Sequence, residues 1–310
     1  MTTLDRRSAR FLMCRPEHFA VSYSINPWMD PQSWLRDERA HTAAADEWAA
    51  LHRKLVELGA TVEHVPPVAG LPDLVFTANA AVVLDRQVLL ARFRHPERRR
   101  EEAHFETVFR SLQARGLVDA VRRLPEGLTL EGAGDCVFDQ SRELFWMGYG
   151  PRSDAAAHGA VEDMFGCEAL ALELADKRFY HMDTALAPLP GGEVMYLPEA
   201  FTTAGRSAIR DRVARHERIE IGLEDGCRLA ANAVVLGHTL VVSDCSERLR
   251  AELKERGYEV VTTPLPSFLR SGGSAFCLTL RLDRQSVPVS AAVHHSASKD
   301  ARRRASAAVA

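Results

Sequence analysis

Residues 77–93, TANAAVVLDRQVLLARF, decide the fold, because their pattern returns three more times along the chain. The stretch begins with small and polar residues, enters an apolar strand, turns at Asp85 and continues as a second apolar strand. A charged segment with the periodicity of an amphipathic helix follows at residues 97–116. The stretch therefore predicts a β-hairpin followed by a helix.

Three later segments repeat this order of two strands, a helix and a further apolar strand. Their turns contain the glycines and polar residues that tight hairpins require. The hairpin segments are EGAGDCVFDQSRELFWMGYG (131–150), HMDTALAPLPGGEVMYLPEAF (181–201) and LAANAVVLGHTLVVSD (229–244). The helical segments that follow them are 153–166, 206–216 and 246–257.

A fifth unit is split between the two ends of the chain. Residues 272–282 supply one strand, residues 10–16 a partner, and residues 31–58 a helix. Pairing the ends would close a ring of five ββαβ modules in a single α/β domain, residues 10–285. No Pro/Gly/Ser-rich linker interrupts this range. The alternative is that strand–strand–helix units recur by chance, as they do in many α/β proteins.

One residue near the start of each unit marks the repeat. The marker residues are Asn79, Glu131, His181, Asn232 and Cys277, separated by 52, 50, 51 and 45 residues. A ring places equivalent strand starts around one axis, so these five side chains are expected to meet in one pocket.

Composition excludes several classes of protein. The 310 residues are 46% hydrophobic and 26% charged with a net charge of −3, which favours neither nucleic acid nor an anionic membrane as a partner. We find no signal-like or membrane-spanning apolar run, so a cytoplasmic location with reduced cysteines is expected. No two of the six cysteines form a CxxC pair, so a structural zinc site is not expected. Residues 286–310, rich in Ala, Ser and Arg, are predicted to be a disordered tail.

Two motifs could carry nucleophilic chemistry. Cys277 lies in SGGSAFCLTLRL (271–282), where small residues open a strand and let a ligand approach the backbone. His181 lies in RFYHMDTAL, with Asp183 two residues later, so on a strand both would face the same side. An imidazole can shuttle a proton and a carboxylate can hold a cation. The alternatives are a buried core thiol and a structural histidine.

Acidic and amide residues stand in two further loops. LEGAGD (130–135) contains Glu131 and Asp135, and LPDLVFTAN (71–79) contains Asp73 and Asn79. The Arg-rich RFRHPERRREE follows, where Arg98 or one of its neighbours could grip a substrate carboxylate. The alternative for Glu131 and Asp135 is a turn with solvated acidic side chains. The alternative for the Arg-rich segment is a solvated helix start.

Six motifs in order resemble the guanidine-modifying superfamily: LPDLVFTAN, FRHPER, LEGAGD, GYGPRSD, FYHMDT and SGGSAFCLTLRL. The resemblance covers residues 10–283 and implies the five-bladed α/β propeller (pentein) fold. It also implies site roles that composition and spacing do not give. Cys277 is similar to the family's nucleophile, His181 to its general acid/base, and Glu131 and Asp183 to its guanidinium-binding carboxylates. The resemblance further implies that Asp73 binds substrate, that Arg98 and Arg152 clamp its carboxylate, and that Asn26, in INPWM, belongs to a substrate loop.

Asn79 departs from the aspartate that arginine deiminases and dimethylarginine hydrolases carry here. An amide has lost the charge but gained a donor for a neutral ureido group. FTAN, LEGAGD and INPWM together resemble the cyanobacterial-type arginine dihydrolases, which convert arginine to ornithine, carbon dioxide and two ammonia. A deiminase, a dimethylarginine hydrolase, an amidinotransferase and a non-catalytic binding protein of the same fold remain alternatives. The resemblance implies a small-molecule substrate, arginine or a derivative, and no metal or cofactor; it leaves a homo-oligomer open.

Overall fold

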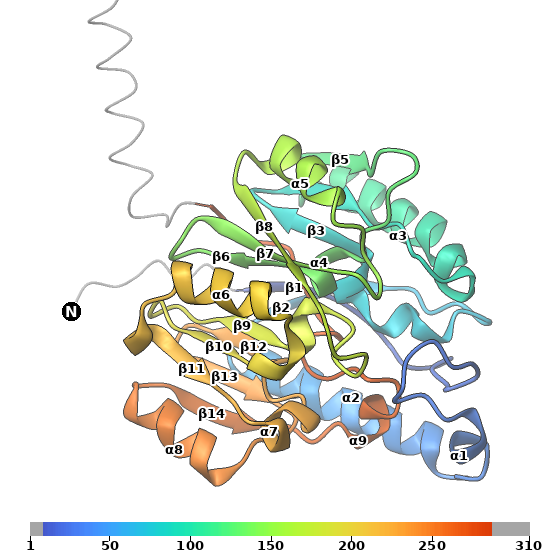
Figure 1. The fold of residues 1–310 in the computed structure, drawn as a ribbon. Coiled ribbons are helices and arrows are strands. Elements are labelled where there is room, and N and C mark those ends of the chain that lie inside the picture. The colour runs from blue at the N-terminus through green and yellow to red at the C-terminus, as the bar shows by residue number, and fades with distance from the viewer. Residues whose placement is uncertain (1–8, 287–310) are drawn as a thin grey trace, which may run out of the picture.

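The computed structural model describes residues 9–286, which form five three-stranded sheets arranged in a ring (Figure 1). In each sheet the middle strand is the second strand of its module. It pairs antiparallel with the first strand and parallel with the third strand, which follows the helix. The predicted α/β ring of ββαβ modules is confirmed. The predicted tail lies outside the described residues except for Ser286.

Four modules are continuous in sequence. The first contains β3 (Ala81–Leu84), β4 (Gln87–Leu90), α3 (Pro96–Ala114) and β5 (Ala120–Arg123). The second contains β6 (Cys136–Asp139), β7 (Leu144–Tyr149), α5 (Ala157–Phe165) and β8 (Glu168–Glu173). The third contains β9 (Leu186–Pro188), β10 (Val194–Tyr196), α6 (Thr203–Arg212) and β11 (Arg218–Glu220). The fourth contains β12 (Val234–Leu236), β13 (Thr239–Val242), α8 (Glu247–Glu255) and β14 (Glu259–Thr262).

The fifth module joins the two ends of the chain. It contains β15 (Leu280–Arg281), β1 (Arg10–Cys14), α2 (Ala40–Glu57) and β2 (Thr61–Val65). Phe11 pairs antiparallel with Arg281 and parallel with Val62, so β1 holds the C-terminal strand in the ring. The predicted helix over 31–58 is two helices, α1 (Pro31–Leu35) and α2, separated by a turn. Short helices α4 (Gly132–Asp135), α7 (Leu223–Cys227) and α9 (Pro266–Leu269) lie in connections.

Local chemistry explains where elements turn and begin. Asp85 and Arg86 both have positive φ, 50° and 61°, as a type I′ hairpin turn requires between β3 and β4. The Ser246 side chain accepts a hydrogen bond from the Leu249 amide at the start of α8. Gly166 ends α5 in the left-handed conformation, with φ of 67°. These modules thus carry local signals for a turn, a helix start and a helix end.

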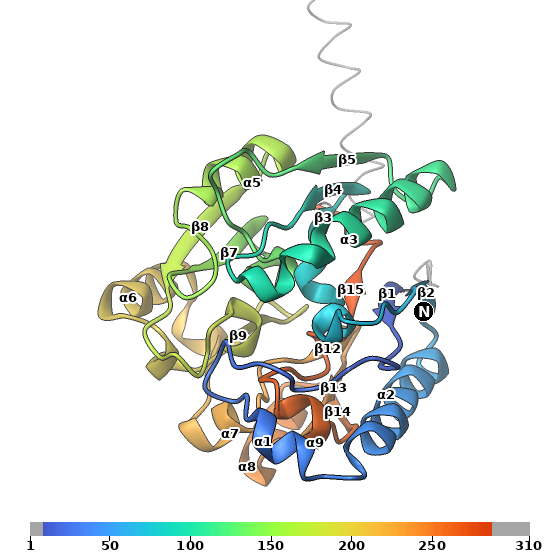
Figure 2. The ribbon, with the colours of Figure 1, turned by 90° about the vertical axis from the view of Figure 1, so that its right-hand side faces the viewer.

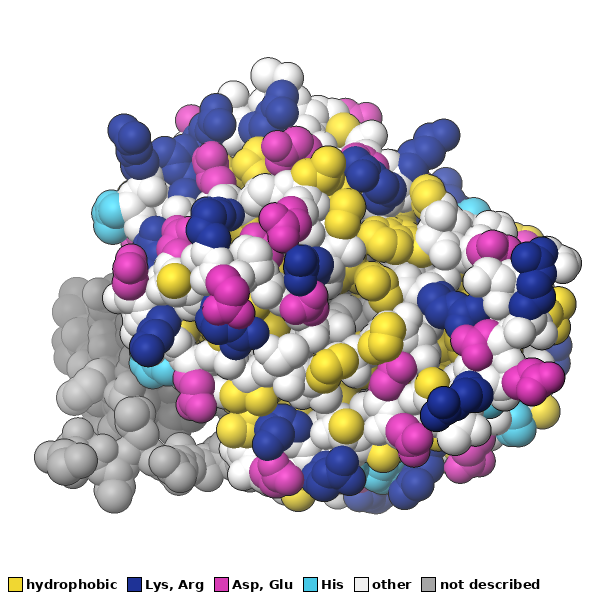
Figure 3. All heavy atoms as spheres, turned by 90° about the horizontal axis from the view of Figure 1, so that it is seen from below, with side chains coloured by type: hydrophobic (Ala, Val, Ile, Leu, Met, Phe, Trp, Pro, Cys, Tyr) yellow, Lys and Arg dark blue, Asp and Glu magenta, His cyan; other side chains and the backbone are white. Residues whose placement is uncertain are grey.

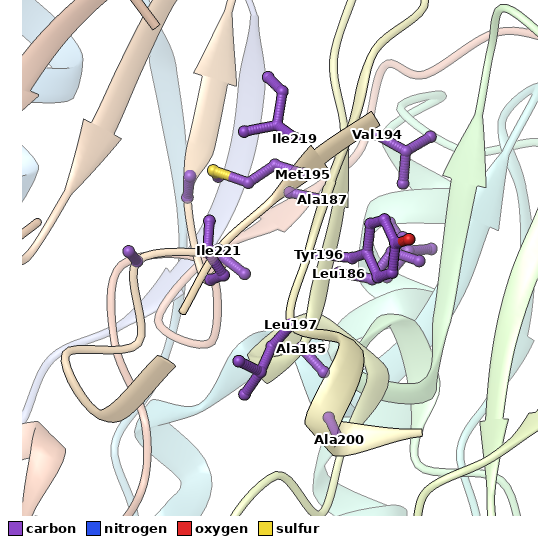
Figure 4. Packing of buried hydrophobic residues seen from close by; sticks show 14 of the residues in the cluster. Ala185, Leu186, Ala187, Val194, Met195, Tyr196, Leu197, Ala200, Ile219 and Ile221 are labelled. Carbon is purple, nitrogen blue, oxygen red and sulfur yellow. The ribbon is translucent and has the colours of Figure 1, made fainter. Parts of the chain in front are cut away.

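The apolar interior is shared between neighbouring modules, because each of the four buried clusters combines side chains from at least two modules. α2, α3, α5, α6 and α8 lie outside the sheets (Figures 1 and 2). Figure 4 shows Met195, Leu197, Ile219 and Ile221 packed within the third module, and all four are buried. Burial of this kind contributes about 1.5–3 kcal/mol per large apolar side chain. The helices lie between sheets, since α5 contacts β4 as well as β8 and α6 contacts β8 of the preceding module, while the inner strands face the ring axis.

The surface shows no preference for one sign of charge on the face seen in Figure 3, where basic and acidic side chains are interspersed. Among the described residues, no helix is long and apolar enough to cross a membrane.

The loops before the first strands of neighbouring modules approach each other closely. Gly132 has φ of +61°, and a Cβ there would lie 2.7 Å from the backbone of Ala78 and Asn79. A Cβ on Gly134 would lie 2.2 Å from the Asn79 amide nitrogen. The glycines of LEGAGD therefore allow the loop that carries Glu131 to pack directly on the loop that carries Asn79.

Gly132→Ala should lower the free energy of unfolding by about 3 kcal/mol or more, because it adds a backbone clash to the strain of a positive φ. Gly127→Ala is the matched control, since Gly127 has φ of +82° with nothing within 4 Å of a Cβ. It should lose only about 1 kcal/mol. Urea unfolding of both variants checks this, and equal losses would contradict the role given to the close approach.

Candidate active site

The five marker residues meet at the end of the ring where the first strands begin. His181 contacts both Glu131 and Asn79, while Asn232 contacts Cys277. All five are buried, with exposed fractions of 3% or less. The expectation that the repeat spacing would collect these side chains in one place is confirmed.

His181 and Glu131 form the first half of the cluster. His181 Nε2 lies 2.8 Å from Glu131 Oε2, and the same oxygen accepts a hydrogen bond of 2.9 Å from Arg152 Nη1. The Asn79 amide nitrogen lies 3.5 Å from His181 Nδ1. This arrangement suits a neutral imidazole whose proton sits on Nε2, which leaves Nδ1 able to take a second proton.

Charge pairing sets the protonation of this half. Burial alone would raise the pKa of Glu131, but Arg152 and the His181 hydrogen bond hold that pKa well below its usual value. Burial lowers the pKa of His181 to about 4, even though Glu131 opposes the shift. At neutral pH the free protein therefore holds an ionised Glu131 beside a neutral His181.

Cys277 and Asp183 form the second half. Cys277 Sγ lies 3.2 Å from Asp183 Oδ2 and 3.1 Å from the Asn232 amide nitrogen. Burial and then the Asp183 carboxylate raise the pKa of the Cys277 thiol well above its usual value, while burial raises the pKa of Asp183 to about 7. The second oxygen of Asp183, Oδ1, is buried without a hydrogen-bond partner. A cation bound here would satisfy the carboxylate and favour the thiolate.

The predicted strand geometry of the HxD pair is wrong. His181 precedes the 3₁₀ turn Met182–Thr184, and β9 begins only at Leu186. The turn sends the His181 side chain to Glu131 and that of Asp183 to Cys277. Cys277 likewise precedes β15 and does not lie within it. The chemistry-bearing residues therefore lie in the turns ahead of the strands, where the backbone is not committed to a ladder.

Asn79 is held in one orientation. Its Oδ1 accepts a hydrogen bond of 2.8 Å from Arg98 Nη1, and Arg98 is paired through two nitrogens with the buried Glu101. Arg98 also donates to the Asp73 carbonyl. These contacts use four of the five guanidinium N–H groups, and the second N–H on Nη1 takes part in none of them. The clamp that the resemblance implies for Arg98 stays a prediction, and in this structure Arg98 positions the Asn79 amide.

One of the three consecutive arginines at residues 98–100 points inward. Arg98 is 2% exposed, whereas Arg100 is exposed and Arg99 donates to the carbonyls of Phe93 and Arg94. Only Arg98 of these three contacts the cluster.

The loop at residues 16–30 covers the cluster. Tyr23 donates to Asp73 Oδ2 over 2.8 Å, and Asp73 Oδ1 is buried without a partner. Arg152 Nη2 donates to the Ile25 carbonyl, and Asn26 donates to the Ser271 carbonyl. The loop residue Asn26 thus reaches the segment that leads to Cys277, as a substrate loop would.

A cavity of about 610 Å³ adjoins the cluster beneath this loop. Its lining includes Ile25, Asn26, His95, Arg152, Lys177 and Tyr180. The Arg152 guanidinium lies 4.6 Å from the centre of the Tyr180 ring. Because Arg152 belongs to both the cavity and the Glu131 contact, the cavity is the natural approach to the buried cluster.

Sequence reasoning missed several site residues. Asn232 carried the repeat signal but received no role, although its side chain bridges the thiol and the Asp183 backbone. The Ser153 hydroxyl donates a hydrogen bond of 2.6 Å to Asp135 and accepts one from the Glu131 backbone amide. Glu101, a charged residue inside a helix, gave no signal at all. Within residues 9–286, no three His, Cys, Asp or Glu side chains gather as a metal site would require.

This fold and this buried cysteine, histidine and carboxylate set define a pentein hydrolase of the arginine-modifying class. A family model described as N,N dimethylarginine dimethylhydrolase, eukaryotic, matches residues 15–284. The chain belongs to this family, whose members act on C–N bonds of the guanidine group.

Curated relatives span the described domain. The bifunctional arginine dihydrolase/ornithine cyclodeaminase ArgZ of Synechocystis sp. is 39% identical over 279 residues, covering 90% of this chain and 38% of the relative. AgrE of Nostoc sp., described in the same words, is 40% identical and covers 92% and 39%. The N(G),N(G)-dimethylarginine dimethylaminohydrolase of Mycobacterium tuberculosis is 35% identical and covers 89% and 86%. The chain thus spans about two fifths of the length of the two bifunctional relatives.

Solved structures agree with the fold. The N-terminal domain of ArgZ bound to substrate superposes with a TM-score of 0.85 at 38% identity, covering 90% of this chain and 100% of that one. A dimethylarginine dimethylaminohydrolase adduct gives a TM-score of 0.69 at 19% identity, which shows the fold alone.

Asp183→Asn should shift the alkylation of Cys277 to lower pH by about one unit, because it removes a negative charge and a hydrogen-bond acceptor that both raise the thiol pKa. Iodoacetamide labelling between pH 7 and 10, read at the Cys277 peptide by mass spectrometry, measures this. Cys245, buried in another module, is the reference in the same digest. An unchanged Cys277 profile would show that Asp183 does not control the thiol.

Proposed function

We propose that this protein is an arginine dihydrolase, which converts free arginine to ornithine, carbon dioxide and two ammonia through covalent Cys277 intermediates. The observation that carries the proposal is the Asn79 amide. Arg98 holds its oxygen, so its nitrogen is presented toward His181 as a donor. A neutral donor in this place suits the oxygen of a neutral ureido group, whereas a guanidinium has only N–H donors and would rely on Glu131 and Asp183.

The comparisons support the same reaction. Two relatives that match about nine tenths of this chain are described as arginine dihydrolases. One structure of the ArgZ N-terminal domain is described as covalently bound to a reaction intermediate, with a TM-score of 0.85 at 38% identity. The match covers the whole of that domain and about nine tenths of this chain.

In the first half of the reaction, the substrate guanidinium lies between Glu131, Asp183 and Asn79. Its positive charge satisfies the free oxygen of Asp183 and stabilises the Cys277 thiolate. The Cys277 thiol gives its proton to the neutral His181, the thiolate attacks the central guanidinium carbon, and His181 returns that proton to the departing nitrogen. Ammonia leaves, and the carbon remains bound to sulfur as a thiouronium.

In the second half, His181 removes a proton from water, which attacks the thiouronium carbon and breaks the carbon–sulfur bond. The product is a ureido amino acid. In a dihydrolase the thiol attacks this ureido carbon again and expels the second ammonia. Water then cleaves the resulting thiocarbamate, and the carbamate decomposes to ornithine and carbon dioxide.

We also propose supporting roles for the remaining residues. Arg152 and Arg98 bind the substrate carboxylate, Asp73 its amino group, and Asn26 closes the loop over it. We further propose that residues 10–285 are one catalytic domain that works in the cytoplasm without metal or cofactor. The six cysteines are free thiols, which suits a reducing compartment.

Purified protein should convert arginine to ornithine with about two ammonia per arginine, and Cys277→Ala should lower kcat by about 10⁴-fold or more. Ornithine, citrulline and ammonia are quantified in one reaction. Citrulline with one ammonia would instead indicate a deiminase. The second candidate is a dimethylarginine dimethylaminohydrolase, which the family model and the Mycobacterium tuberculosis relative favour. Release of dimethylamine from dimethylarginine would indicate it.

Asn79→Asp should lower the ornithine-to-citrulline ratio by about tenfold, because a carboxylate loses the donor to the ureido oxygen while still gripping a guanidinium. The ratio is its own control, since it does not depend on how much variant protein is folded. An unchanged ratio would remove Asn79 from the account of the second hydrolysis.

A further inference from the structure

Two narrow cavities lie along the ring axis behind the catalytic cluster. One, between β3, β6 and β15, has about 20 Å³ of space for water, and the other, between β6, β9 and β12, has about 10 Å³. A water molecule needs roughly 10–15 Å³ of such space. Together the cavities touch the first strand of every module, so they follow the axis.

The two cavities share part of their walls. Val137, Phe276 and Arg284 line both of them. Phe276 precedes the nucleophile in sequence and is partly exposed, although it lies among buried neighbours. The two cavities therefore adjoin at these three side chains, and together they are the axial passage.

The inner end of the passage reaches the reaction centre. Asp183 lines the second cavity and accepts the Cys277 hydrogen bond over 3.2 Å. Asp183 Oδ1 is fully buried and unpartnered. A buried carboxylate oxygen beside a cavity of this size is a place where a small hydrogen-bonding molecule is stabilised.

The outer end is closed by a cation. Arg284 follows β15, is partly exposed, and donates to the Phe138 carbonyl at the far end of β6. Arg281 also lines the first cavity. A guanidinium stays charged in proteins, so this end repels ammonium but not neutral ammonia or water.

We infer that the ring axis is a second route to the reaction centre, through which neutral ammonia leaves and water enters while the amino acid fills the front. The inference rests on the proposed function, because each hydrolytic cycle consumes one water and releases one ammonia. At the front the loop at residues 16–30 is tied down by Tyr23, Ile25 and Asn26. The apolar walls suit a neutral molecule, since an unpaired ammonium ion would be costly there.

Ala187→Leu should obstruct this route. Ala187 lies on β9, lines the second cavity and is 6% exposed. Ala169→Leu is the matched control, because Ala169 is also a strand alanine, 5% exposed, but lies on the edge strand β8 and lines neither cavity. Both changes add the same volume to a packed interior. Arg284→Ala should have the opposite effect by removing the side chain at the outer end.

The first readout uses turnover of arginine in the presence of ¹⁵N-ammonium. Labelled ammonia that reaches the thiouronium adds to its carbon, the carbon–sulfur bond breaks, and labelled arginine returns. Relative to Ala169→Leu, Ala187→Leu should lower kcat and the label in unreacted arginine by about fivefold or more, with KM unchanged. Arg284→Ala should raise the label by a similar factor.

The second readout needs no turnover. Hydrogen peroxide, neutral and small, oxidises the Cys277 thiol to a sulfenic acid and is itself reduced to water. Trapping the sulfenic acid with dimedone gives the rate by mass spectrometry, which should fall in Ala187→Leu and rise in Arg284→Ala. If wild-type protein does not consume arginine, the proposed function fails while this measurement still decides the route. Rates equal to the Ala169→Leu control in both variants would overturn the inference.

Discussion

The pairing of β1 with both β15 and β2 is the constraint on which the site depends. It joins residues more than 260 positions apart, since Phe11 pairs with Arg281, and it closes the ring that the other modules begin. The Arg10 amide donates to Asp283, and the Leu282 amide donates to the Arg10 carbonyl, which fixes the same register. Because Cys277 lies just before β15, this closure places the nucleophile opposite a histidine from another module.

Burial then determines how charge is distributed at the centre of the ring. Arg152 compensates Glu131, whereas Asp183 shares its environment with a thiol, so burial keeps the pKa values of both Asp183 and Cys277 high. Neither group gains by ionising alone, because both are buried. The unpaired oxygens of Asp73 and Asp183 show where positive charge is lacking. The arginine of the proposed function, with a guanidinium at one end and an amino group at the other, would supply both charges.

The fold separates what is common to the family from what selects one reaction. The sheets and helices lie outside, and the residues that carry chemistry lie in turns ahead of the first strands. Asn79 depends on Arg98, and Arg98 on the buried Glu101, whose pKa burial raises to about 7 although Arg98 opposes the shift. Under the proposed function, a change of the Asn79 side chain would alter the product without disturbing the ring, because the strands do not rely on that side chain.

The sequence by itself determined the ring of modules, because hairpin turns, strand alternation and helical periodicity are local signals that recur about every fifty residues. It also identified the five marker positions, since the repeat spacing locates strand starts. Only the tertiary structure decided where the side chains point. His181 and Asp183 separate at a 3₁₀ turn, and Asn232 contacts the thiol. These contacts form between modules, across distances in sequence that no local pattern encodes, so packing of the closed ring had to settle them.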